Sequence, residues 1–234
     1  MNSIRKDRIK ILTRSREDFF NKYIKTFYDM QELPNSSFFF HKKVLETYNQ
    51  NLYTNLFSND HYFEYIYATL ATWGMDRLFK SASLQEFHKF KQSAIHHKEL
   101  LEKLASFKIN QLDEKSLKEI KKDILELFNN LIIMRSDSKI VGLSKTLHHF
   151  LPELILPIDR KYTINFFYKD NLKGYPNINK NDEENMFISI FEQSYYICKE
   201  LNLTKADLKN KWDTSIPKLI DNAIIGFVLL HKNS

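Results

Sequence analysis

Apolar residues recur at every third or fourth position through most of the chain, and this spacing is the period of an α-helix. The pattern is clearest in 84–107 and returns in 116–134, 181–201 and 216–231. No stretch alternates apolar and polar residues between two turn signals, as a half-buried strand would. The sequence therefore predicts an all-α protein.

Turn-forming residues are scarce, with only 4 Gly and 5 Pro among 234 residues. A many-stranded sandwich or a glycine-rich nucleotide fold needs more of them. Hydrophobic residues make up 43% of the chain and include 19 Phe, which supplies a large core and excludes disorder for most of the sequence. We expect one all-α domain over residues 1–234, as a single compact body or as two helical lobes.

The charge is concentrated near the start of the chain. The formal net charge is +6, and residues 1–16 hold six Lys or Arg residues against the single acid Asp7. Such a run can neutralise phosphates and give nucleic-acid affinity that does not depend on sequence. A solvated terminal helix would carry the same charges, so this run alone does not choose between the two.

Several classes of protein are excluded by what the sequence lacks. The single cysteine, Cys198, rules out an intramolecular disulfide and fits a reducing cytoplasm. The longest apolar run, 223–230, is far too short to span a membrane. The adjacent histidines of 96–97 and 148–149 point in different directions on a helix and do not converge on one ion. We expect a cytoplasmic protein with no metal, no cofactor and no membrane partner.

The segment 138–167 is the most informative for function. It contains one of the four glycines and two prolines. Its pattern predicts a turn at Gly142, a new helix from Ser144 that loosens before Pro152, and a buried extended connection. Asp159 then stands where the next helix should begin, so it could serve only as a helix cap.

This segment resembles the helix-hairpin-helix DNA glycosylase superfamily. Residues 140–146 (IVGLSKT) resemble the hairpin and its lysine, and Pro157-Ile158-Asp159 resembles the aspartate motif. The chain departs from the family pattern in having Val141 for the usual Pro and Ser144 for the second Gly, and Asp159 follows Lys145 by fewer positions than usual. The resemblance covers a helix-hairpin-helix-like element at about 135–168 and implies an all-α fold.

The resemblance also implies a chemistry. Asp159 would stabilise an oxocarbenium-like sugar or activate a water, and Lys145 would either attack the sugar as an amine or contact a phosphate. His148 and His149 are further candidates to flank this site, and of this adjacent pair we expect one to face solvent and the other the core. The residues implied for binding duplex DNA are Gly142, Ser144, Lys139, Arg160 and Lys161, and those implied for the pocket of a flipped base are Tyr162 and Trp73.

The function expected from these features is excision of a damaged or modified base from double-stranded DNA. The absence of iron–sulfur cysteines leaves room for an unusual base, for example a modified base in invading phage DNA. Two alternatives stay open: a DNA-binding helical module without catalysis, and a helical protein-interaction factor. Substitution of Asp159 distinguishes the DNA-binding module from an enzyme. In the module Asp159 would only cap a helix, so its substitution should not affect DNA binding.

Overall fold

The computed structural model describes residues 3–30, 35–76, 83–136, 138–169, 172 and 178–232. The predicted all-α fold is confirmed. In these ranges the extended pairing is a single isolated antiparallel bridge between Leu84 and Met134. This bridge explains why the helix predicted from residue 84 begins only at Phe87.

The helices follow one another along the whole described chain. The short elements η1, η2 and η3 are π-helical, and η4 and η5 are 3-10 turns. In chain order the elements are α1 (Ser3–Leu12), α2 (Arg16–Asp18), η1 (Phe19–Ile24), α3 (Lys25–Asp29), α4 (Asn35–Gln50), α5 (Tyr53–Leu56), α6 (Asp60–Leu70), η2 (Ala71–Met75), α7 (Phe87–His96), α8 (Lys98–Ala105), α9 (Glu114–Asn130), α10 (Ile140–Phe150), η3 (Arg160–Ile164), α11 (Asn165–Tyr168), η4 (Lys180–Asp182), α12 (Glu183–Glu200), η5 (Lys205–Asp207) and α13 (Ile216–His231).

Two helix starts show how the sequence sets the element boundaries. Asp113 accepts the backbone N–H of Ser116 and caps α9, and Ser215 accepts the N–H of Lys218 and caps α13. Pro217 follows in the first turn of α13, where its missing N–H costs nothing. The last helix therefore spans the predicted residues.

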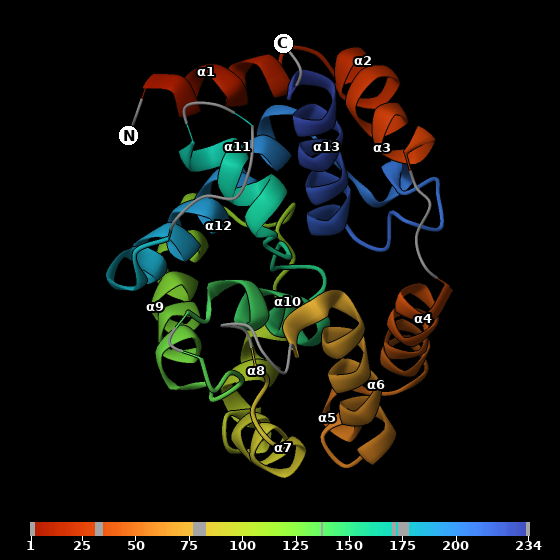
Figure 1. The fold of residues 1–234 in the computed structure, drawn as a ribbon, viewed down its shortest axis with the longest axis vertical. Helices are drawn as coiled ribbons and strands as arrows, with labels where there is room; N and C mark the ends of the chain where they lie inside the picture. The colour runs from red at the N-terminus through yellow and green to blue at the C-terminus, as the bar shows by residue number, and fades with distance from the viewer. Residues whose placement is uncertain are drawn as a thin grey trace.

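The helices form two groups with α10 between them (Figure 1). In one group, α13 packs against η1, α3, η3 and α12, while α1 packs on α11. The other group contains α4 to α9, with α4 against α6 and α8 against α9. Helix α10 contacts α6 of one group and α12 of the other. One continuous cluster of buried apolar residues runs through both groups, so the chain forms a single domain.

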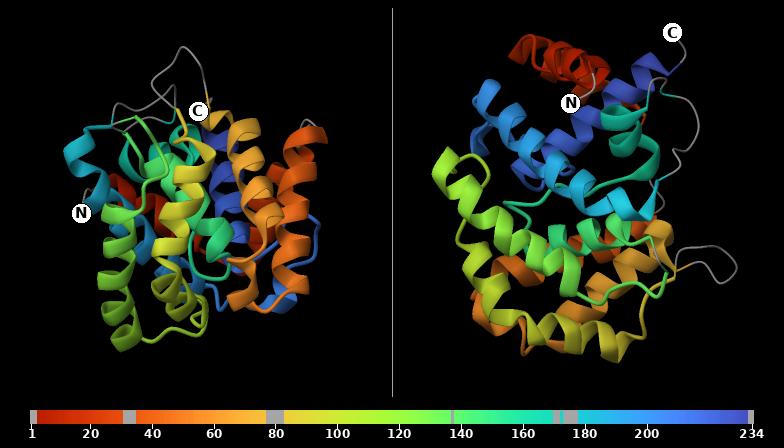
Figure 2. Two further views of the ribbon diagram at one scale, coloured as in Figure 1. Left: turned by 90° about the horizontal axis from the view of Figure 1, so that it is seen from below. Right: turned by 90° about the vertical axis from the view of Figure 1, so that its left-hand side faces the viewer.

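The two ends of the chain are held in the same group, at the top of Figure 2, right. Helix α13 passes so close to η1 that a Cβ atom at Gly226 would lie 1.9 Å from the carbonyl oxygen of Tyr23. A side chain larger than hydrogen does not fit there.

Part of the basic run is used inside the fold. Arg8 is buried and donates to the carbonyl oxygens of Asn165, Phe166 and Lys169 around the end of α11. Arg16 donates to the carbonyl of Leu201 after α12 and pairs with Asp207 at 2.6 Å. Cations at helix C-termini satisfy free carbonyls and complement the helix dipole. These two arginines therefore hold the terminal group of helices together.

Candidate functional site

Lys145 and Asp159 lie side by side at the boundary between the two helix groups. As expected, the helix ends at Phe150, just before Pro152, and residues 155–159 run extended until Asp159 begins η3. This turn brings Lys145 Nζ to 3.6 Å from Asp159 Oδ2. The side chain of Lys145 is only 10% exposed and that of Asp159 35%. The two residues form an ion pair that is slightly too long to be a hydrogen bond.

Asp159 is also the cap of η3. Its Oδ1 atom accepts the backbone N–H groups of Lys161, at 2.8 Å, and Tyr162, at 3.3 Å. The two carboxylate oxygens therefore have different partners. Oδ1 accepts the free N–H groups at the start of η3, and Oδ2 faces the ammonium of Lys145. Asp159 therefore caps η3, as expected, and pairs with Lys145 at the same time.

A second polar chain ties Asp159 to α13. The backbone N–H of Asp159 donates to Thr163 Oγ1 at 3.0 Å, and that hydroxyl lies 3.5 Å from Asp221 Oδ1. Lys218 Nζ pairs with the other oxygen of Asp221 at 2.6 Å. Burial raises the pKa of the Asp221 carboxyl, and the charge of Lys218 opposes this rise. Through Thr163, these contacts connect the backbone of Asp159 to helix α13.

Sequence reasoning did not single out Asp221 and Lys218. Both come more than 50 residues after Asp159, and nothing in local spacing links them to it. One signal was present: α13 is otherwise strongly apolar, and a Lys and an Asp three positions apart in such a helix, the Asp buried and the Lys half-buried, are rarely retained unless paired.

Trp73 covers Lys145 on the side of α6. It lies on η2, and Lys145 Nζ is 5.4 Å from the centre of its ring, close enough for a cation–π contact. The same ring is 5.4 Å from the His41 ring and 5.2 Å from the His149 ring. Tyr162, the other residue expected in a base pocket, is half-buried against the core, with Lys161 Nζ 5.2 Å from its ring.

The histidines on α10 correct one expectation. His148 and His149 are both buried, so the expectation that one of them faces solvent is wrong. Helix α10 lies between the two groups and is covered on every side from Gly142 to Phe150. Burial lowers the pKa of His148 to about 3 and that of His149 to about 4, so both imidazoles are neutral at pH 7.

The turn expected at Gly142 is wrong, because Gly142 lies inside the continuous helix α10. The helix begins at Ile140, where the buried Glu183 carboxylate accepts the backbone N–H groups of Lys139 and Ile140 and the hydroxyl of Ser138. An internal carboxylate therefore already occupies the anion position expected for a phosphate. The close neighbour of Gly142 is Met134, whose sulfur would lie 2.3 Å from an added Cβ.

The other residues expected to bind DNA differ in their burial and in their contacts. Ser144 is buried, and its hydroxyl donates to Val141 and accepts the N–H of Ile158. Lys139 Nζ lies 4.7 Å from the Phe128 ring, and burial lowers its pKa. Arg160 donates to the hydroxyl of Ser138, whereas Lys161 is exposed. Of the five, Lys161 is exposed, Lys139 and Arg160 are half-buried, and Gly142 and Ser144 are buried.

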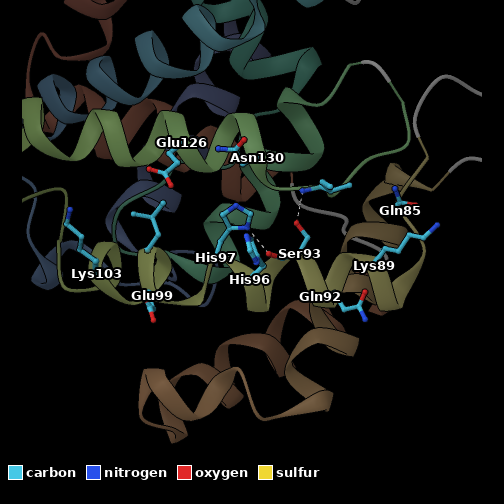
Figure 3. Close-up of a pocket in the computed structure, with 12 residues that line it drawn as sticks. Gln85, Lys89, Gln92, Ser93, His96, His97, Glu99, Lys103, Glu126 and Asn130 are labelled. Carbon is cyan, nitrogen blue, oxygen red and sulfur yellow. Dashed lines mark hydrogen bonds between the residues drawn. The ribbon is translucent and has the colours of Figure 1, made fainter.

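An open groove of about 1040 Å³ lies elsewhere, between α7, α8 and α9 (Figure 3). Its walls carry both signs of charge, with Lys89 and Lys103 against Glu99 and Glu126. His97 lies in it and is held by a hydrogen bond to the Ser93 carbonyl. None of the residues expected from the sequence to form a site lines this groove.

We call the polar residues at the boundary of the two helix groups the junction cluster, which comprises His41, Trp73, Lys145, His149, Asp159, Thr163, Lys218 and Asp221. Over the ranges that the structure describes, no three His, Cys, Asp or Glu side chains are arranged to hold a metal ion. No helix of that part of the chain has the length and apolarity to cross a membrane. Comparison with protein-family models, with curated proteins and with solved structures found no significant match to this chain.

Proposed function

We propose that the protein is a DNA glycosylase-like enzyme that hydrolyses the N-glycosidic bond of a modified base. The observation that carries the proposal is the Lys145–Asp159 pair, in which a carboxylate and a lysine from adjoining elements meet at the boundary of two helix groups. The all-α class of the fold and the order of the lysine and the aspartate in the sequence support the same proposal, since both are shared with the helix-hairpin-helix glycosylases that the sequence resembles.

Asp159 has the properties that this chemistry requires. Cleavage of an N-glycosidic bond develops positive charge on the sugar, and a fixed carboxylate near it stabilises that charge or takes a proton from the attacking water. Both its backbone N–H and its Oδ1 atom are held by hydrogen bonds, so the carboxylate is already oriented. A group that needs no reorganisation contributes most to the rate.

Lys145 and Trp73 complete the proposed site. The ammonium group compensates the charge of Asp159 and offers a cation to a phosphate beside the target nucleotide. The half-buried indole of Trp73 supplies a flat apolar surface for a base that has left the stack. Because Glu183 fills the N-terminus of α10, duplex DNA would be held by surface cations such as Lys161 and by the chain's net charge of +6 rather than by the hairpin.

The proposal is tested by searching for the released base. The purified protein is incubated with genomic DNAs of differing base modification, including modified phage DNA, and the small-molecule fraction is analysed by mass spectrometry. We expect one modified base to be released from one of these DNAs. Retention of DNA at low salt without release of any base would favour the non-catalytic module, and no retention at all would contradict a DNA function.

A further inference from the structure

A chain of hydrogen bonds fixes the protonation of two buried histidines. His149 Nδ1 lies 2.7 Å from the carbonyl oxygen of Lys145. A carbonyl oxygen only accepts, so Nδ1 of His149 carries the proton and donates it. The ring is neutral, because burial holds its pKa at about 4, and Nε2 is therefore an acceptor.

The same reasoning extends to His41 on α4. His41 Nδ1 lies 3.2 Å from His149 Nε2. Since His149 Nε2 is an acceptor, Nδ1 of His41 must be the donor. Burial also lowers the pKa of His41 well below its usual value, so this ring is neutral and its Nε2 carries a lone pair. In the described part of the chain, that Nε2 has no hydrogen-bond partner.

The lone pair of His41 Nε2 belongs to a ring that lies close to the proposed site. The His41 ring packs against Trp73, and Trp73 in turn covers Lys145, which pairs with Asp159. His41 thus places a hydrogen-bond acceptor beside a flat aromatic surface at the edge of the proposed site. A ligand that donates an N–H can therefore bond to this acceptor without displacing a protein group of the described chain.

We propose that His41 is a specificity-determining residue: its Nε2 accepts a hydrogen bond from a ring N–H of a planar heterocyclic base that stacks on Trp73. His149 is the positioning residue, because it holds His41 in the tautomer that leaves Nε2 free to accept. The inference rests on the proposed function for the class of ligand, but binding of a free base can be measured without any base release.

The tautomers are tested directly by NMR on protein labelled with ¹⁵N at histidine. We expect His41 and His149 both to be neutral, with the proton on Nδ1, at pH 7. His149→Gln keeps a donor for the Lys145 carbonyl and an acceptor for His41, so the His41 tautomer should persist. His149→Phe removes both and should release His41 to the Nε2–H form. A wild-type His41 with its proton on Nε2 would overturn the inference.

Binding is tested through the fluorescence of Trp73. The chain has two tryptophans, so a Trp212→Phe background makes Trp73 the only indole emitter. The probes are free adenine, hypoxanthine, thymine and uracil, with 1,3-dimethyluracil as a matched ring without N–H. We expect at least one base to change the emission, and its affinity to fall about tenfold in His41→Phe, the value of one lost hydrogen bond.

The control variants separate the possible results. His88→Phe alters an exposed histidine and should leave the affinity unchanged, and His149→Gln should retain binding that His149→Phe loses. Tight binding of 1,3-dimethyluracil, equal binding by His41→Phe, or no response to any base at millimolar concentration would each contradict the role of His41. Base binding that needs His41, in a protein that releases no base from DNA, would support this inference while contradicting the proposed enzyme.

Discussion

The ammonium of Lys145 lies 3.6 Å from the carboxylate of Asp159, although the two residues are fourteen positions apart along the chain. The turn after Pro152 makes this contact, and it also joins the two groups of helices. Asp159 has one oxygen committed to a helix cap and one to Lys145. Because asparagine caps a helix about as well as aspartate but carries no charge, the two tasks can be separated by substitution.

Lys145→Met tests whether the lysine acts as a cation or as a nucleophile. In the structure the amine faces Asp159 as an ion pair, so we expect no covalent adduct when wild-type protein and DNA are treated with borohydride. We expect base release by the variant to fall about tenfold or more, since Asp159 loses the group that orients Oδ2. A trapped adduct in the wild type that disappears in Lys145→Met would show instead that Lys145 attacks the sugar.

Glu183→Ala tests the internal anion at the start of α10. The substitution leaves the N–H groups of Lys139 and Ile140 without an acceptor, and we expect a loss of about 2–3 kcal/mol in the free energy of unfolding. Sulfate should restore part of this stability by entering the vacated position. Glu184→Ala, one residue further along α12, is the control and should change little. Equal stabilisation of both variants by sulfate would contradict the account.

Replacement by alanine should destabilise the protein strongly at one helical glycine and hardly at all at another. At Gly226 the new Cβ meets the backbone of Tyr23 at 1.9 Å, which cannot move without separating α13 from η1, and we expect a loss above about 3 kcal/mol. At Gly142 the obstacle is the flexible end of Met134, and the better helix propensity of alanine offsets its shift to within about 1 kcal/mol. Urea unfolding measures both. A large loss at Gly142 would mean that it does more than fit inside a helix.

The buried histidines predict a stability that falls in mild acid. Their folded pKa values, about 3 for His148 and about 4 for His149, lie below the value near 6.5 of the unfolded chain. Between these limits the unfolded chain binds protons that the folded chain does not. Stability is therefore complete above about pH 6.5 and drops by about 1.4 kcal/mol per pH unit for each histidine as the pH falls.

Urea unfolding between pH 7.5 and 5 measures this slope. His149→Gln should reduce the slope by the contribution of one histidine, whereas His88→Gln, on the surface, should leave it near the wild-type value. An unchanged slope in His149→Gln would show that His149 is not held neutral in the folded protein.

Local pattern was enough to predict the helices and the position of Asp159 at the start of one. Helix periodicity and capping residues act over a few positions, and Pro152 and Pro217 mark where helices end and begin. The turn at Gly142 was mispredicted for two reasons. The glycine leaves room for the side chain of Met134 rather than forming a turn, and the start of the helix is set by Glu183, which lies 43 residues beyond Ile140. The same limit hid His41 and Asp221, because His149 and Thr163, the residues that they contact, are distant in sequence and meet them only after folding.

The most direct test of the proposed function is the rate of abasic-site formation by wild type, Asp159→Asn and Asp113→Asn on the DNA from which a base is released. Both substitutions exchange a capping aspartate for asparagine, but Asp113 caps α9, outside the junction cluster. We expect Asp159→Asn to lose about a hundredfold or more of the activity at an unfolding free energy within about 1 kcal/mol of wild type, and Asp113→Asn to keep full activity. Full activity in Asp159→Asn would contradict the account and leave Asp159 as a helix cap alone.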